Sequence, residues 1–112
     1  MNKETNPIGY AEQAQIDAWK EKYKLKYVPE ITTTDEEGQE HVTYVKKPNL
    51  ELLQLLANKA KVNQEIKGLE MVFQAVRIGG SEEVLADEDM KYAAMIATGK
   101  LFRRTEAKLK KR

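Results

Sequence analysis

The sequence has 112 residues, the length of a single domain, and its 19 lysines and arginines against 18 aspartates and glutamates leave a formal net charge of +1. A chain with so little net charge has no overall attraction to nucleic acid or to acidic membranes. The absence of cysteine excludes a disulfide framework, a thiolate nucleophile and a zinc–thiolate site. No apolar run approaches the roughly 20 residues of a membrane span, and the polar start, with Lys3 and Glu4, predicts no signal peptide.

The N-terminal region divides into a leader and a first helix. Residues 1–10 carry asparagine, proline and glycine and are predicted to be flexible, ahead of a single domain over residues 11–112. Trp19 and Tyr23 recur at helical spacing, which predicts a helix over residues 11–22. Trp19 is the only tryptophan, and it has two interpretations. It either anchors a binding partner or docks this helix on the core, and the second is the commoner role of such a side chain.

The next segment predicts an antiparallel β-hairpin. Apolar and polar residues alternate over residues 24–33, the period of a half-buried strand. Residues 35–38, Asp-Glu-Glu-Gly, form the turn, and residues 40–47 form the return strand with Val42 and Tyr44 on the buried face. A hairpin is marginally stable alone, so helices are expected to cover one of its faces.

The acidic residues of this hairpin surround the only histidine, His41. They are Glu30, Asp35, Glu36, Glu37 and Glu40. A calcium loop needs acidic ligands at alternate positions around a central glycine, and this spacing does not provide them. One histidine cannot make a two-histidine metal site. We therefore expect a solvated hairpin tip without metal or cofactor, and the alternative of a small enzyme that uses these carboxylates and His41 is disfavoured because no pocket is evident.

A leucine-rich helix over residues 50–60 is the most distinctive element. Its start is indicated by Pro48 and by Asn49, a good N-cap residue. Five leucines lie within its first seven residues: Leu50, Leu52, Leu53, Leu55 and Leu56. A short helix that is apolar over more than half its surface is either buried on several sides or pairs with another molecule. We take Leu52, Leu55 and Leu56 as candidate partner-binding residues.

A second apolar helix is predicted over residues 64–78. Its stripe at helical spacing consists of Ile66, Leu69, Val72, Phe73 and Val76. Asn63 is the expected N-cap, and Gly79-Gly80 is expected to end the helix, since a phosphate loop would not be followed by Ser81-Glu82-Glu83. Gly68 inside the pattern indicates that the helix begins later or that a neighbour packs closely there.

The last part of the sequence predicts a further helix, which follows the helix over residues 64–78, and then a basic tail. Asp87 is the expected N-cap of the helix, within an acidic stretch over residues 81–89. The tail over residues 100–112 has seven lysines and arginines against one glutamate. It is interpreted either as a nucleic-acid contact or, preferably, as a solvated helix end. Phe102, Arg103 and Arg104 are further candidate partner-binding residues. If the acidic and basic regions lie at opposite ends of the molecule, copies are expected to attract each other head to tail; in the alternative, the fold brings the two regions together.

The order of these elements resembles a group of small phage and prophage proteins encoded near tail genes and regarded as tail assembly chaperone-like. The resemblance covers residues 22–112 and is carried by Tyr44, Val45, Lys47, Pro48, Ile78, Gly79, Gly80, Glu82, Glu83 and Asp87. It implies a small helical protein that coats the tape-measure protein while the tail tube polymerises, self-associates and has no catalytic residues. Its place would be the cytoplasm of the bacterial host.

Together these features predict an α+β domain with an N-terminal helix, one antiparallel β-hairpin and three to four helices packed against it. The predicted function is non-enzymatic. Tape-measure or tube protein and further copies of the chain are the expected partners, with no membrane or cofactor and nucleic acid only as the alternative. The candidate partner-binding residues are Trp19, Leu52, Leu55, Leu56, Phe102, Arg103 and Arg104.

Overall fold

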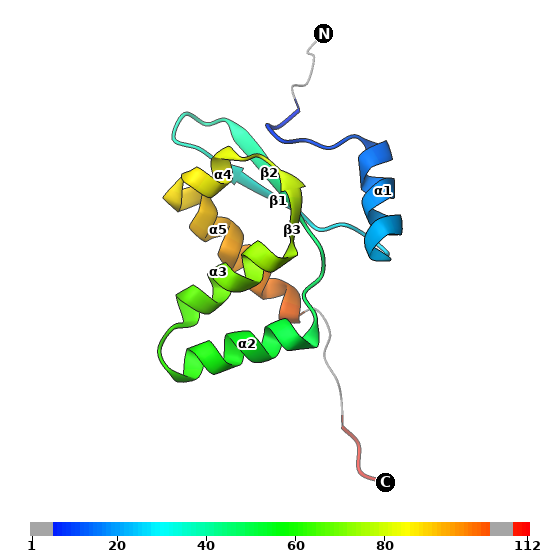
Figure 1. The fold of residues 1–112 in the computed structure, drawn as a ribbon, viewed down its shortest axis with the longest axis vertical. Helices are drawn as coiled ribbons and strands as arrows, with labels where there is room; N and C mark the ends of the chain where they lie inside the picture. Colours follow the sequence, from blue (N-terminus) through cyan, green and yellow to red (C-terminus); the bar gives the residue numbers. More distant parts are fainter. Residues whose placement is uncertain (1–5, 104–108) are drawn as a thin grey trace.

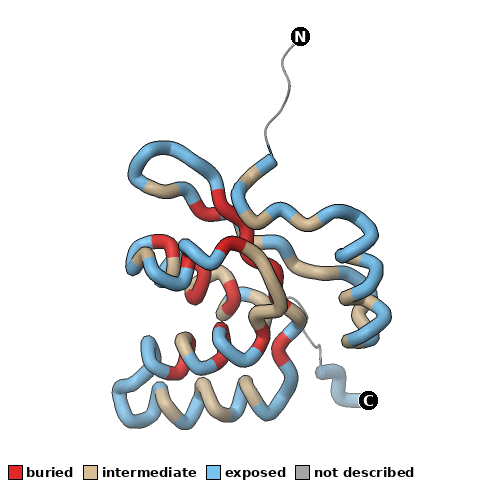
Figure 2. Tube along the Cα trace, turned by 45° about the horizontal axis from the view of Figure 1, so that its top comes forward, coloured by how far each residue is buried: buried red, intermediate tan, exposed pale blue. Residues whose placement is uncertain are grey.

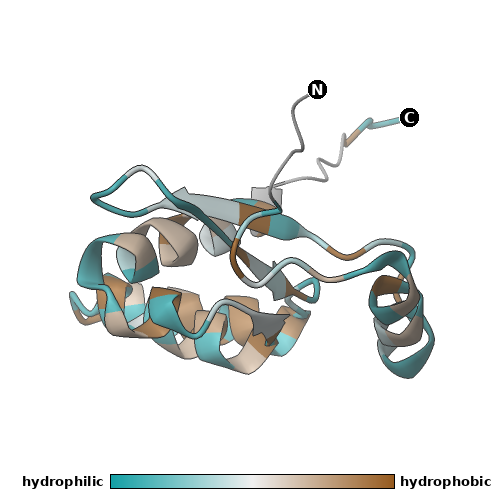
Figure 3. Ribbon diagram, turned by 90° about the horizontal axis from the view of Figure 1, so that it is seen from above, coloured by the Kyte–Doolittle hydropathy of each residue, from teal (hydrophilic) through white to brown (hydrophobic). Residues whose placement is uncertain are grey.

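The structure, a computed structural model, describes residues 6–103 and 109–112. Within these ranges the fold is α+β, as predicted, with an antiparallel sheet in the order β1-β2-β3 and a layer of helices over one of its faces (Figure 1, Figure 3). The elements are α1 (Gln13–Tyr23), β1 (Glu30–Thr34), β2 (Glu40–Val45), α2 (Leu50–Lys61), α3 (Glu65–Val76), β3 (Arg77–Gly80), α4 (Glu83–Ala86), α5 (Glu88–Gly99) and the 3₁₀ helix η1 (Lys100–Arg103). None of the described helices has the length and apolar character that a membrane span requires.

The predicted hairpin forms, but its first strand is shorter than expected. β1 and β2 pair antiparallel around the predicted turn, with Thr32 opposite Val42. Residues 24–29 do not belong to the strand: Lys24 takes a left-handed conformation at the end of α1, with φ of 57°. Pro29 has no N–H to donate to a ladder, so the strand begins at the residue after it.

The sheet has a third strand where the sequence predicted a helix end. α3 stops at Val76, and residues 77–80 pair with β2, placing Gly79 opposite Tyr44 and Gly80 opposite Thr43. Gly80 has φ of +119°, and a Cβ atom there would lie 2.5 Å from the carbonyl oxygen of Val42. Only glycine permits this backbone to lie so close to β2. The predicted helix over residues 64–78 was therefore too long at its C-terminal end, and the two glycines belong to a strand of the sheet.

The second face of the sheet is covered around β2, whereas on β1 the residues of that face, Glu30, Thr32 and Thr34, stay exposed and polar as expected. Residues 41–45 of β2 are all buried, with Val45 in the core under the helices and Tyr44 against the N-terminal part of the chain. Ile8 forms a parallel bridge with His41, and its N–H donates to the carbonyl oxygen of Glu40 at 2.9 Å. The structure thus pairs Ile8 of the predicted leader with β2, while residues 1–5 lie outside the described range.

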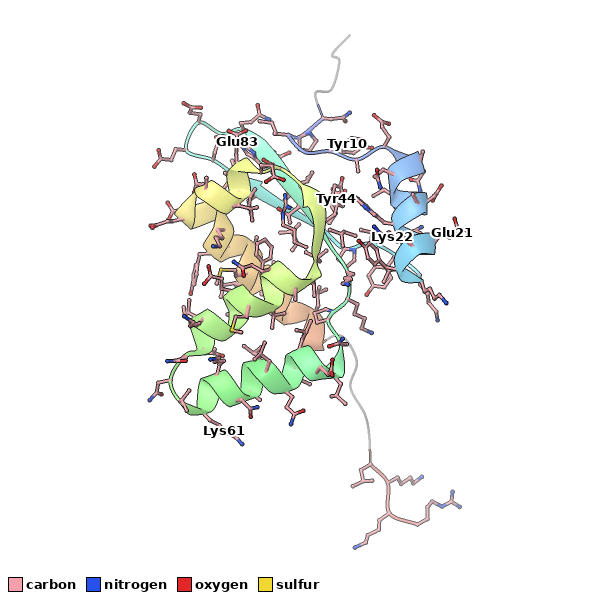
Figure 4. The ribbon with its side chains drawn as sticks, viewed as in Figure 1. Tyr10, Glu21, Lys22, Tyr44, Lys61 and Glu83 are labelled. Carbon is pink, nitrogen blue, oxygen red and sulfur yellow. The ribbon has the colours of Figure 1, made fainter. Side chains whose placement is uncertain are left out.

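Helix α1 stands beside the sheet and docks on it through Trp19 (Figure 1). The Trp19 ring lies 5.3 Å from the Tyr44 ring, centroid to centroid. A Cβ atom on Gly79 would lie 2.6 Å from two carbons of the Trp19 ring, so the indole rests directly on the glycine backbone. The Tyr44 hydroxyl, which accepts a hydrogen bond from the Ala11 N–H at 3.1 Å, lies between the sheet and α1 (Figure 4). Trp19 therefore has the docking role.

The main core lies between the sheet and helices α3 and α5, while α2 lies outside α3 (Figure 2). Its buried residues are Val45, Leu69, Phe73, Val76, Val84, Met90, Ala94 and Met95. Gly68 lets α2 and α3 approach closely, because a Cβ atom there would lie 3.1 Å from the Leu56 side chain. That selects close packing from the two expectations for this glycine.

Two of the three predicted helix caps are confirmed. The Asn49 side chain accepts a hydrogen bond from the Leu52 N–H at 2.9 Å, and that of Asp87 accepts one from the Met90 N–H at 3.0 Å. The prediction for Asn63 was wrong. It takes a left-handed conformation, with φ of 62°, in the turn before α3, and Gln64 precedes that helix. Asparagine tolerates this conformation better than most residues, which suits it to the tight turn.

The contact of Trp19 with Gly79 gives a first prediction. Gly79→Ala should lower the free energy of unfolding by about 1–3 kcal/mol and shift the tryptophan fluorescence, because the added methyl group overlaps the indole ring. Chemical denaturation followed by fluorescence and by circular dichroism measures both. The same substitution in a Trp19→Ala background should cost much less. An equal cost in both backgrounds would contradict the contact as the cause.

Candidate protein-binding surface

Helix α2 packs on the rest of the protein by one side only. None of its residues is buried: the side chains of Leu50 and Leu53 are 77% and 40% exposed, and Leu52, Leu55 and Leu56 are half-buried. Leu52 and Leu56 pack against the core cluster. The possibility that the helix is buried on several sides is therefore excluded for this conformation. A leucine-rich surface remains open to a partner.

An apolar groove, here named the leucine groove, runs between α2, α3 and the end of α5. It has a volume of about 430 Å³. It is lined by Leu53, Leu56, Leu69, Ile96 and Gly99, with Glu65 and Lys100 also in its wall. A Cβ atom on Gly99 would lie 2.9 Å from the Leu69 side chain. Glycine at this position therefore lets α5 lie close to Leu69 and adds no side chain that would fill the groove. Such a groove offers an apolar seat for one or two aliphatic side chains of another molecule.

A second groove, here named the acid-rimmed groove, lies between α3 and the first half of α5. It has a volume of about 390 Å³, and its apolar lining comes from Ile66, Tyr92 and Met95. Its charged residues are Glu70, Glu88, Asp89 and Lys91. The Lys91 ammonium group lies 2.6 Å from the Glu70 carboxylate, and this contact lowers the pKa of Glu70. The cation is thereby paired, and the remaining two carboxylates make the rim acidic.

The structure divides the candidate residues among different roles. Trp19 docks α1, and Leu52 and Leu56 hold α2 on the core, although Leu56 also lines the leucine groove. Leu55 is half-buried on α2. The backbone of Phe102 and Arg103 belongs to η1, while their side chains and the whole of Arg104 lie outside the described part.

Several surface residues were not recognised as candidates from the sequence. Ile66 was assigned to the buried stripe of its helix, but its side chain is 53% exposed because it lies in the first turn of α3, beyond the reach of the core. Leu53 was one of five leucines with no signal to separate it from the others. Tyr92 and Ile96 come from α5, and only its packing against α3 brings them beside residues 66 and 69. No local pattern carries that information.

A buried polar cluster joins the hairpin turn to the start of α4. The side chain of His41 is fully buried, and its Nε2–H donates to the Asp35 carboxylate at 2.9 Å. In the neutral imidazole the other nitrogen, Nδ1, then accepts a hydrogen bond from the Ser81 hydroxyl at 2.8 Å. Ser81 Oγ also accepts from the Glu83 N–H at 3.3 Å. The expectation of a solvated tip holds for the exposed Glu36 and Glu37, but His41 belongs to the interior.

The same three residue types form the catalytic triad of hydrolases, but the arrangement differs. In a triad the serine faces Nε2 and the aspartate faces Nδ1, and the serine is open to substrate. Here both partners are exchanged, and Ser81 is only 3% exposed. In the described conformation the cluster therefore connects three segments of chain and has no access to a substrate. No three acidic or histidine side chains of the described residues are placed to share a metal ion.

An acidic cleft lies between the hairpin turn and α4. It is lined by Asp35, Glu36, Glu37, Glu83 and Asp87 together with Ala86 and Met90. Figure 4 shows Glu83 at the same end of the molecule as the hairpin turn. Asp35 and Asp87 already accept hydrogen bonds from His41 and from the start of α5. The other carboxylates give this end of the protein a negative surface.

Comparison with known proteins adds no relative to these observations. No protein-family model matches the chain. No curated protein sequence and no solved structure matches it either.

The bond between Asp35 and His41 makes stability depend on pH in acid. It lowers the pKa of the Asp35 carboxyl below its ordinary value of about 3.9. Because the folded pKa is the lower one, the carboxylate stabilises the fold above about pH 4, and this contribution is lost as the pH falls through the folded pKa. Asp35→Asn should therefore lower the melting temperature at neutral pH, and its difference from the parent protein should shrink in acid.

Thermal melts over a pH series measure this dependence. Glu36→Gln removes a carboxylate from the same turn and is the matched control, expected to leave the melting temperature almost unchanged at every pH. If the difference between the Asp35→Asn variant and the parent protein stayed constant into strong acid, the hydrogen bond would not be the source of the stabilisation.

Proposed function

We propose that this protein is a non-enzymatic, tail assembly chaperone-like binding protein of a phage or prophage. It holds apolar segments of the tape-measure or tube protein in the leucine groove, associates with further copies of itself, and acts in the cytoplasm of the bacterial host. The observation that carries the proposal is the one-sided packing of α2, which leaves Leu50 and Leu53 exposed beside an apolar groove.

The groove has the chemistry of a helix-binding or segment-binding surface. Exposed apolar patches that are rimmed by charged residues commonly mark protein interaction sites. Here the aliphatic lining from α2, α3 and α5 is bordered by Glu65 and Lys100. An amphipathic helix that lays its apolar side into such a groove gains affinity by burying aliphatic surface, and the charged border sets its orientation. A chaperone that coats another protein needs a surface of this kind.

Most of the residues that carry the resemblance to phage proteins lie in the sheet and at the start of α2, and they support the proposal as residues that determine the fold. Tyr44, Val45 and Pro48 are buried, and Gly79 and Gly80 form the strand beside β2. These residues fix the sheet and the start of α2, and none of them lines the leucine groove. The shared motifs thus support a shared architecture, while the leucines of α2 support the binding role.

The buried cluster supports a non-enzymatic role. His41 and Ser81 are the residues best suited to proton transfer or nucleophilic attack near the hairpin, and both are almost completely buried. Their hydrogen bonds are used to join the turn, β2 and the segment before α4. These hydrogen bonds give the polar groups of His41 and Ser81 a structural role.

The leucine groove gives a direct test. Leu53→Asp should weaken binding to tape-measure segments, or to tube protein, from the same gene cluster by at least tenfold, about 1.4 kcal/mol, because it places a charge in the apolar lining. Isothermal titration calorimetry with purified proteins measures the change. Circular dichroism checks that the variant is folded, as expected for a side chain that is already 40% exposed.

Asn58→Asp is the matched control, since it adds the same charge at an exposed position of α2 that does not line the groove. It should bind like the parent protein. If the parent protein bound neither tail protein, or if both variants weakened binding equally, the proposed use of the groove would be wrong.

A further inference from the structure

The C-terminal end of the chain has an unusual combination of charge and exposure. Residues 100–112 carry seven lysines and arginines against one glutamate. The last four residues are Leu-Lys-Lys-Arg, and the Leu109 side chain is 100% exposed. They lie well clear of the helices in Figure 1 and Figure 4. An apolar side chain followed by three cations is thus presented to solvent.

The acid-rimmed groove has the complementary properties. Ile66 and Tyr92 are 53% and 48% exposed, and with Met95 beneath them they form an apolar seat. Lys91, the groove's own cation, is paired with Glu70 at 2.6 Å. Glu88 and Asp89 lie in the first turn of α5 and are exposed. The groove therefore offers apolar surface beside two exposed carboxylates.

The position of the tail indicates which copy supplies the occupant. Glu88 and Asp89 lie at the start of α5, whereas the tail follows its other end, about 18 Å away for a helix of 12 residues. Leu109 does not contact its own groove, since it is fully exposed. Nine residues lie between Gly99 and Leu109, and the ten Cα–Cα steps from one to the other span at most about 33 Å, which is enough to reach a neighbouring molecule.

From this complementarity we infer that the acid-rimmed groove of one copy binds the C-terminal residues 109–112 of a second copy. Leu109 enters the apolar seat between Ile66 and Tyr92, and Lys110 and Lys111 pair with Glu88 and Asp89. The inference gives an interface to the self-association in the proposed function and rests on that part of it alone. Capture of tail protein in the leucine groove does not depend on it.

Each copy has one acid-rimmed groove and one C-terminal tail, so the contact joins two different surfaces and can continue from copy to copy. Sedimentation velocity at increasing protein concentration should show the mass rising from 12.8 kDa to at least twice that value at low salt. High salt should shift the rise to higher concentration, because the pairs are exposed to solvent. A monomer at every concentration and salt level would overturn the inference.

Paired charge reversals locate the contact. Glu88→Lys with Asp89→Lys should abolish the rise in mass, and so should removal of residues 109–112. Combining the groove reversal with Lys110→Glu and Lys111→Glu should restore association, which a merely destabilised groove variant would not do. Glu36→Lys with Glu37→Lys makes the same charge change at the exposed hairpin turn and should leave association intact. Equal loss in that control would place the contact in the acidic cleft and overturn the assignment.

A direct binding measurement separates this contact from the other possible role of the tail. A synthetic peptide of residues 100–112 should bind the chain that lacks residues 109–112, and its affinity should fall at least tenfold with the groove reversal. If the tail instead bound duplex DNA with steep salt dependence while the protein stayed monomeric, the tail would be a nucleic-acid contact and the inference would be wrong. Neither result affects the proposed binding of phage tape-measure or tube protein to the leucine groove.

Discussion

The burial of β2 on both faces is the constraint on which the structure depends. Five consecutive residues, 41–45, are inaccessible to solvent, although two of them carry polar side chains that alternate with apolar ones. One edge of the strand pairs with β1, and the other pairs with β3 and with Ile8. Both faces then need cover: the helical layer supplies it over Val45, and Trp19 of α1 supplies it beside Tyr44. β1, β3 and Trp19 of α1 contact this strand directly, whereas α2 lies on α3.

The close approach of β3 to β2 has consequences for the rest of the chain. Glycine at positions 79 and 80 removes the side chains that would keep the strands and α1 apart. Ser81 then follows directly at the point where it meets His41, and α4 begins two residues later. The Asp35–His41–Ser81 cluster therefore satisfies both ring nitrogens of the buried His41 and connects the hairpin turn to the segment before α4. The hydroxyl of Thr43, the other buried polar side chain of β2, has no hydrogen-bond partner among the described residues.

The same architecture leaves apolar surface of α2 exposed to solvent. The sheet and helices α3 and α5 already form a complete core, so α2 can only add a further layer on α3. A helix in that position buries one side, and Leu50 and Leu53 remain exposed. The charges are also separated, with carboxylates near the hairpin turn and the start of α5, and cations after its end. A surface with apolar grooves and separated charge is suited to binding other chains.

The sequence by itself determined the local features whose signals lie within a few residues: the helices, the hairpin turn, and the caps at Asn49 and Asp87. It also determined the excess of leucine in α2. The tertiary structure decided how these parts use one another. Gly79-Gly80 has the same local signature as a helix end or a close strand pair, and only β2 opposite selects the strand. His41, at the start of β2, is buried and hydrogen-bonded to Ser81, forty residues away. Ile66 is exposed because the core residues of α3 begin at Leu69, about one turn after it. Grooves arise where separate helices meet, so their lining follows from packing between distant segments.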